Sequence, residues 1–224
     1  MPGFLRSRES NLQALKELSE GLLRSAGRTD VRGNLLEIHH PNAPVIDPAF
    51  LHPVSEFHGV SISLNQDERS VAGQRVQCAS RQLPFQDRAF SMVVLHHVIG
   101  SGEEAELAEA VRVLSGQGVL LLLGLNSMGW RYRRQDEIRH LPGIRPLRVR
   151  SRLEGLGMTL HGFAGAGLAG GKRPEFMGAG LSSLAAPLAD VVLLQARHRG
   201  GPEVTPLRLG KTRSTVVQSA PMRG

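Results

Sequence analysis

Cysteines, aromatic residues and long apolar runs are all scarce in this chain of 224 residues, which has one Cys, one Trp and one Tyr. One cysteine excludes an internal disulfide framework and a cysteine-rich zinc site. The longest apolar run, between Gly118 and Gly124, is far shorter than the ~18–20 residues of a membrane-spanning helix. The first ten residues lack the apolar core of a secretory signal. We therefore expect a cytoplasmic protein with no membrane partner.

Acidic residues are scarce in the C-terminal part of the chain. The net charge is +7, and residues 127–224 carry 16 Lys and Arg against 6 Asp and Glu. Such a basic third can contact an acidic protein or an RNA backbone. A solvated, arginine-rich surface explains the same composition, and the chain offers few aromatic rings for base stacking. Both interpretations stay open.

Apolar periodicity predicts an α/β protein. Leucines at three- and four-residue steps predict a first helix. Helices are expected at 11–24, 103–114 and 147–156, and strands at 34–38, 59–64, 75–79, 90–95, 119–123, 158–163 and 190–196. A turn is expected at 115–118, whose sequence is Ser-Gly-Gln-Gly. The strands 90–95 and 119–123 are apolar on both faces, which indicates a parallel strand–helix–strand unit covered on each side.

The predicted architecture is a mainly parallel, seven-stranded sheet with helices on both faces and an antiparallel last strand. Residues 1–30 would hold a capping helix, 31–200 the main domain, and 201–224 a basic, flexible tail.

The middle of the chain resembles class I S-adenosylmethionine-dependent methyltransferases, in particular the subgroup called methyltransferase type 11. That subgroup shows a Leu-Pro-Phe segment, an apolar strand, a loop with histidine, an acidic helix and an Arg-Val-Leu turn. Here these features are Leu83-Pro84-Phe85, Phe90 to His97, and Arg112-Val113-Leu114. The resemblance implies a Rossmann-like fold, S-adenosylmethionine as the cofactor, and methyl transfer to an unidentified acceptor.

The resemblance also implies a set of cofactor-binding residues near the carboxyl ends of the strands. Glu37 would contact the methionine end of the cofactor, and Ser61 stands where the family has an acid for the ribose hydroxyls. The full set is Glu37, Ile38, His39, Ser61, Ile62, Ala79, Leu83 and Leu95.

Four positions depart from the family pattern. The loop 37–44 contains no glycine, although the family has a glycine-rich loop there, and Ser61, Ala79 and Ser91 stand where the family has an acid. Bulky residues such as His39 would fill a vacated cofactor space. The alternative function is therefore a catalytically inactive, methyltransferase-like subunit that binds an acidic protein or RNA through its basic C-terminal third.

Three residues are candidates for catalysis. His96 and His97 follow a central strand, where a histidine can act as a general base; they can equally shape the pocket floor. Asn126 ends the next strand and can orient an acceptor, or simply terminate the strand. No metal site is predicted, because no carboxylate or thiolate stands at a recognised spacing from the histidines. Arg131, Arg133 and Arg134 form a basic cluster that can hold an anion or lie in solvent.

Overall fold

A computed structural model describes residues 12–23, 33–40, 43, 58–63, 82–100, 104–167, 174–175 and 188–200. The strands are β1 (Asn34–His39), β2 (His58–Ser63), β3 (Phe90–His96), β4 (Leu114–Asn126), β5 (Gly143–Ile144), β6 (Met158–Ala166), β7 (Pro174–Glu175) and β8 (Val191–His198). The helices are residues 12–23, α3 (Glu104–Val113), α4 (Trp130–Arg134), the 3-10 turn η1 (Asp136–Ile138) and α5 (Pro146–Gly155).

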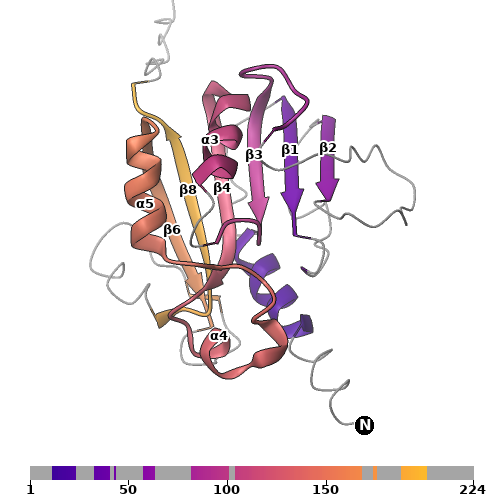
Figure 1. Ribbon diagram of the computed structural model, residues 1–224, viewed down its shortest axis with the longest axis vertical. Coiled ribbons are helices and arrows are strands. Elements are labelled where there is room, and N and C mark those ends of the chain that lie inside the picture. Colours follow the sequence, from indigo (N-terminus) through magenta and orange to yellow (C-terminus); the bar gives the residue numbers. More distant parts are fainter. Residues whose placement is uncertain are drawn as a thin grey trace, which may run out of the picture.

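All the described strands belong to one sheet, with the order β2-β1-β3-β4-β8-β6-β7 and with β5 paired to β4. β2, β1, β3 and β4 are parallel, and β8 runs antiparallel between β4 and β6. In Figure 1 the arrowheads of β1, β2 and β3 point the same way, and that of β8 points the opposite way. The α/β class, the parallel majority and the antiparallel last strand are confirmed. The predicted count of seven is not, because six described strands have six or more residues and β5 and β7 have two each.

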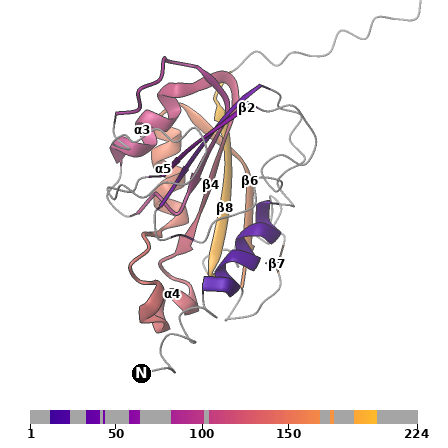
Figure 2. The ribbon, with the colours of Figure 1, turned by 90° about the vertical axis from the view of Figure 1, so that its right-hand side faces the viewer.

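Helices cover both faces of the sheet, as predicted (Figure 2). α3 and α5 pack on one face through buried residues that include Leu107 and Leu153. Helix 12–23 packs on the other face through Leu15, Leu18 and Leu22. Ile138 of η1 and the following Leu141 are buried in the same apolar layer. Successive residues of a strand point to opposite faces of the sheet, so each central strand contributes side chains to the apolar layers on both faces. The central strands are therefore apolar throughout.

The predicted turn at 115–118 is wrong. Phe90 pairs with Leu114 and Met92 pairs with Val119, so the intervening residues of β4 form an irregularity inside the strand. The reason is that Leu114 already pairs with Phe90 of β3, so the strand begins before the expected turn. A Cβ atom at Gly118 would lie 2.6 Å from Cδ1 of Leu114, so glycine permits this close return of the chain.

The residues at the two ends of α5 explain why the helix begins and ends where it does. Pro146 occupies the first turn, where its missing N–H costs nothing. Gly157 follows the helix with φ +76°, a left-handed conformation that favours glycine and ends the helix. The predicted strand 75–79 and the predicted tail 201–224 lie outside the described residues. Within those residues, no helix is long and apolar enough to cross a membrane.

Candidate functional site

The carboxyl ends of β2, β1, β3 and β4 meet at one edge of the sheet (the lower edge in Figure 1). From β1 the chain continues outward to β2, whereas β3 is followed by β4 on the other side. The boundary between β1 and β3 is thus a topological switch point. In open α/β sheets, ligands bind in the crevice beyond the carboxyl strand ends at such a point.

Glu37 of β1 and His96 of β3 meet at the switch point. Glu37 Oε1 lies 3.8 Å from His96 Nδ1, and the Glu37 side chain is 12 % exposed. Burial, followed by the neighbouring His97 and His39, lowers the pKa of His96 well below its ordinary range. At neutral pH the His96 imidazole is therefore uncharged, and the contact is not an ion pair.

His97 is fully enclosed just beyond β3. Its backbone has φ +54°, and its N–H donates to the Leu123 carbonyl at 2.7 Å. Burial, then the charge of His40, lowers the pKa of His97 to about 3. Within the described part of the chain, neither ring nitrogen of His97 has a hydrogen-bond partner, and nor does Nε2 of His96.

The chain after β1 is fastened to the end of β3. His40 N–H donates to the His96 carbonyl at 3.0 Å, and the half-buried His39 lies beside it with Nδ1 3.3 Å from the His40 carbonyl. Burial, His140 and His39 lower the pKa of His40. His140 was not predicted as a site residue, and its electrostatic effect on His40 reveals it. Among the described residues, no group of three His, Cys, Asp or Glu side chains could hold a metal ion.

Asn126, the third catalytic candidate, lies fully buried at the end of β4. Its Nδ2 donates to the Ala189 carbonyl at 2.8 Å, and its Oδ1 accepts from the Met128 N–H at 3.0 Å. Both atoms of the amide group thus hold the turn after β4 to the segment before β8. A role for Asn126 toward an acceptor stays a prediction.

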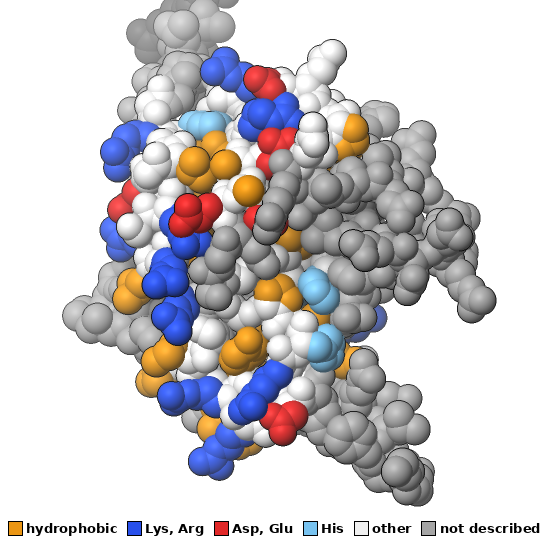
Figure 3. All heavy atoms as spheres, viewed as in Figure 1, with side chains coloured by type: hydrophobic (Ala, Val, Ile, Leu, Met, Phe, Trp, Pro, Cys, Tyr) orange, Lys and Arg blue, Asp and Glu red, His pale blue; other side chains and the backbone are white. Residues whose placement is uncertain are grey.

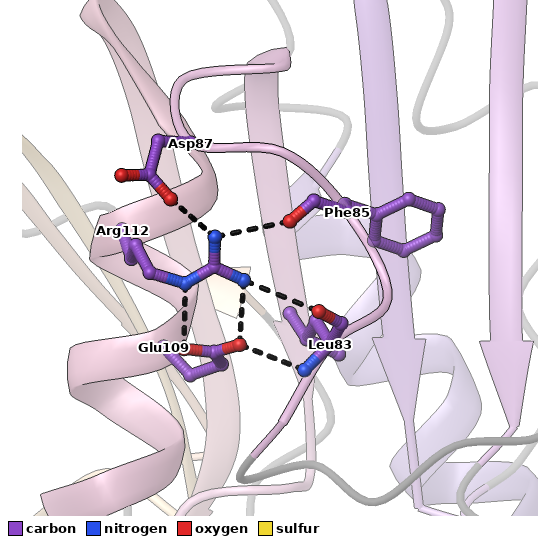
Figure 4. A network of polar contacts seen from close by, with 5 residues as sticks. All are labelled: Leu83, Phe85, Asp87, Glu109 and Arg112. Carbon is purple, nitrogen blue, oxygen red and sulfur yellow. Dashed lines mark hydrogen bonds and ion pairs between the residues drawn. The ribbon is translucent and has the colours of Figure 1, made fainter.

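Leu83 is one of the predicted cofactor residues, and its loop is pinned to α3 (Figure 4). Glu109 Oε1 accepts the Leu83 N–H at 2.7 Å, while Arg112 donates to the Leu83 and Phe85 carbonyls at 3.2 and 3.0 Å. Arg112 also pairs with Glu109 and Asp87, and these two carboxylates raise the pKa of the guanidinium further. Arg112 is the arginine of the Arg-Val-Leu segment, and in this chain it fastens the loop 83–87 to α3.

The other predicted cofactor residues lie on β1, β2 and β3 or outside the described residues. Ile38 and Leu95 are buried in the layer beneath α3 and α5, and they pair with each other across β1 and β3. In the register, Ser61 pairs with Glu37 and Ile62 with Ile38, so the backbone of β2 brings these positions to the same edge. Ala79 lies outside the described residues.

The predicted arginine cluster is divided in the structure. Arg131 is buried, and its Nε lies 3.2 Å from Oδ2 of the fully buried Asp190. Arg133 and Arg134 are exposed, and Arg134 lies over the Trp130 ring. Asp190 was not predicted as a site residue. The sequence does hold a signal for it, because Asp190 is the one acid at the start of an apolar strand in a basic part of the chain.

Two cavities lie beyond the end of β4, and Met128 lines both. One, of about 380 Å³, lies between the start of α5 and the strands β6 and β8. The other, of about 440 Å³, borders α4 and Leu188.

The sequence matches no protein-family model and no curated protein. Solved structures do match. A candidate histamine N-methyltransferase from Thermotoga maritima, which is S-adenosylmethionine-dependent, has a TM-score of 0.57 at 13 % identity, covering 88 % of this chain and 97 % of the other. The chain has the class I methyltransferase fold.

Two further structures with this methyltransferase fold illustrate its range. The complex of the Haloferax volcanii Trm112 methyltransferase activator with a candidate methyltransferase has a TM-score of 0.57 at 9 % identity, covering 86 % of this chain and 93 % of the other. The cyclase SpnF has a TM-score of 0.54 at 14 % identity, covering 80 % and 79 %. Since a fold hosts several chemistries, these similarities show the architecture and not the activity.

Proposed function

We propose that the chain binds S-adenosylmethionine at the edge between β1 and β3 and transfers its methyl group to an acceptor. One observation supports the proposal: Glu37 Oε1 lies 3.8 Å from His96 Nδ1 beside the switch point of the sheet. The neighbouring side chains suit a cationic cofactor. The pKa values of His40, His96 and His97 are all lowered, so these imidazoles stay neutral and do not repel a sulfonium or an ammonium group.

The protein's part in such a reaction is mainly positioning. When bound, the cofactor supplies an activated methyl group. Glu37 would hold a cationic part of it, since a carboxylate forms short, charge-assisted hydrogen bonds to ammonium groups. His96 stays uncharged at neutral pH, and because its pKa is lowered it would be only a weak base toward an acceptor that loses a proton. The pinned loop at Leu83 would supply an apolar wall.

A second candidate function rests on two departures from the family pattern: the loop 37–44 has no glycine, and Ser61 of β2 replaces an acid. The register sets Ser61 beside Glu37, at the position where the family resemblance expects a carboxylate. A chain that has lost the cofactor would be an inactive binding subunit. Its exposed arginines, such as Arg133 and Arg148, would bind an acidic protein or RNA. Retention on a polyanion column at physiological salt tests that partner, because non-specific charge contacts weaken steeply with salt.

Titration with S-adenosylhomocysteine separates the two functions. A ligand at 100 times its Kd stabilises the folded protein by ~2.7 kcal/mol, which a thermal shift detects. The wild type should show this shift, and Glu37→Gln, which keeps the shape but removes the charge, should show a smaller one. Glu154→Gln is the matched control, because Glu154 is exposed on α5 and pairs with Arg150. Absence of any shift at millimolar ligand rejects cofactor binding and favours the inactive subunit.

A further inference from the structure

The described residues expose large hydrophobic side chains at four positions: Met128, Trp130, Leu147 and Leu188. All four line the two cavities beyond the end of β4. Apolar side chains left in solvent and gathered in one place mark a binding surface. In Figure 3, hydrophobic and arginine side chains alternate along the lower left of the molecule, over this part of the fold.

The cavity beside α5 has apolar walls and a basic rim. Leu160 and Phe163 of β6 and Leu194 of β8 form the walls, and Leu147 stands at the rim with 74 % of its surface exposed. Arg145, Arg148 and Arg150 also line it. Its volume of about 380 Å³ falls at the small end of the range of ligand pockets, ~300–1,000 Å³.

The arginines of the rim differ in their partners. Arg150 is paired with Glu154, Nε to Oε1, at 2.9 Å. Arg145 and Arg148 form no ion pair with any described residue, and the first turn of α5 contains no acid. Two guanidinium groups with no ion-pair partner among the described residues lie at the mouth of an apolar cavity, and they complement a ligand that has an apolar body and one anionic end. A guanidinium binds a carboxylate in a two-pronged geometry that suits this arrangement.

We infer that the cavity between α5, β6 and β8 binds a small amphipathic carboxylate, with its apolar body against Leu160 and Phe163 and its charged end at Arg145 and Arg148. Such binding does not require the chain to transfer methyl groups. The cavity reaches Asn126 at the end of β4, so a ligand held there would lie beside the edge that carries Glu37 and His96.

The test uses octanoate, 1-octanol and octylammonium, which share one apolar body and differ in charge. Binding to the full chain is followed by calorimetry and by thermal shift. Octanoate should bind more tightly than octanol, and octylammonium most weakly. The double variant Arg145→Gln/Arg148→Gln should weaken octanoate about tenfold and leave octanol unchanged. Leu147→Ser, at an exposed position that should tolerate the change, should weaken octanoate and octanol alike.

Arg199→Gln is the matched control, since it removes an exposed cation at the opposite edge of the sheet. It should leave all three affinities unchanged. Equal affinity for octanoate and octanol, no binding at millimolar concentration, or unchanged octanoate affinity in the double variant would overturn the inference. Titration with S-adenosylhomocysteine on the same samples reports separately on the proposed function, because Arg145 and Arg148 are not part of the edge between β1 and β3.

Discussion

Asp190 and Arg131 form a buried pair that joins three parts of the fold. Oδ1 of Asp190 accepts the Arg131 backbone N–H at 2.8 Å, and Oδ2 lies 3.2 Å from Arg131 Nε. The backbone of Asp190 bonds to Ala166 of β6 and to Asn126 of β4, each at 2.9 Å. One residue therefore ties α4, β4 and β6 together at the edge that holds the candidate site.

Asp190→Ala should destabilise the protein by about 3–5 kcal/mol, because it leaves the buried Arg131 guanidinium without its carboxylate. Urea unfolding measures the loss. The double variant Asp190→Leu/Arg131→Met removes both charges and should recover part of the stability. Equal stability of the single and double variants would show that the pair is not coupled.

The hydrogen bonds of Arg112 should control the loop 83–88 more than overall stability. Arg112→Lys keeps the charge but cannot bond to Leu83, Phe85 and Glu109 together. We expect a loss of about 1 kcal/mol, since the side chain is 33 % exposed and solvent screens its ion pairs. Hydrogen exchange should show faster exchange of the Leu83 amide. Arg150→Lys, at an exposed pair on α5, is the control and should change neither quantity.

The sequence predicted the elements that depend on periodicity and missed those that depend on distant contacts. Helix 12–23, β3, α3 and α5 follow from apolar spacing within a few residues of their observed bounds. The irregularity at 115–118 depends on the pairing of Leu114 with Phe90, which local turn chemistry does not encode.

The candidate site was predictable in its location but not in its electrostatics. The positions of Glu37, His96 and His97 at strand ends were evident from the pattern of apolar segments. Their burial, and hence the lowered pKa values of the two histidines, required knowledge of what packs around them. The partner of Arg131 was equally hidden, because Asp190 lies 59 residues away in the chain.

Ser61→Asp should strengthen binding of S-adenosylhomocysteine if the edge between β1 and β2 holds a ribose. A carboxylate can accept hydrogen bonds from both ribose hydroxyls, which a serine hydroxyl does less well. Hydrogen bonds to charged groups contribute ~1.5–3 kcal/mol, so we expect about tenfold tighter binding by calorimetry. Ser115→Asp, in the irregular part of β4, should have no such effect. Unchanged affinity in Ser61→Asp would place the ribose elsewhere.

Acid should destabilise the protein through its buried histidines. The pKa of His97 is about 3 in the folded protein and ~6.5 in the unfolded chain. Between these values the unfolded chain binds a proton that the folded protein does not, so the free energy of unfolding falls as the pH is lowered from about 7 toward 3. Each such histidine contributes a slope of at most ~1.4 kcal/mol per pH unit, and His96, whose pKa is also lowered, adds to it.

The variant His97→Asn tests this pH dependence, since asparagine accepts the positive φ at this position and does not titrate. Urea unfolding at pH 7, 6 and 5 should show that the free energy of unfolding falls more steeply for the wild type than for His97→Asn. Parallel pH profiles for the two proteins would mean that His97 is protonated in the folded state or is not buried as the structure has it.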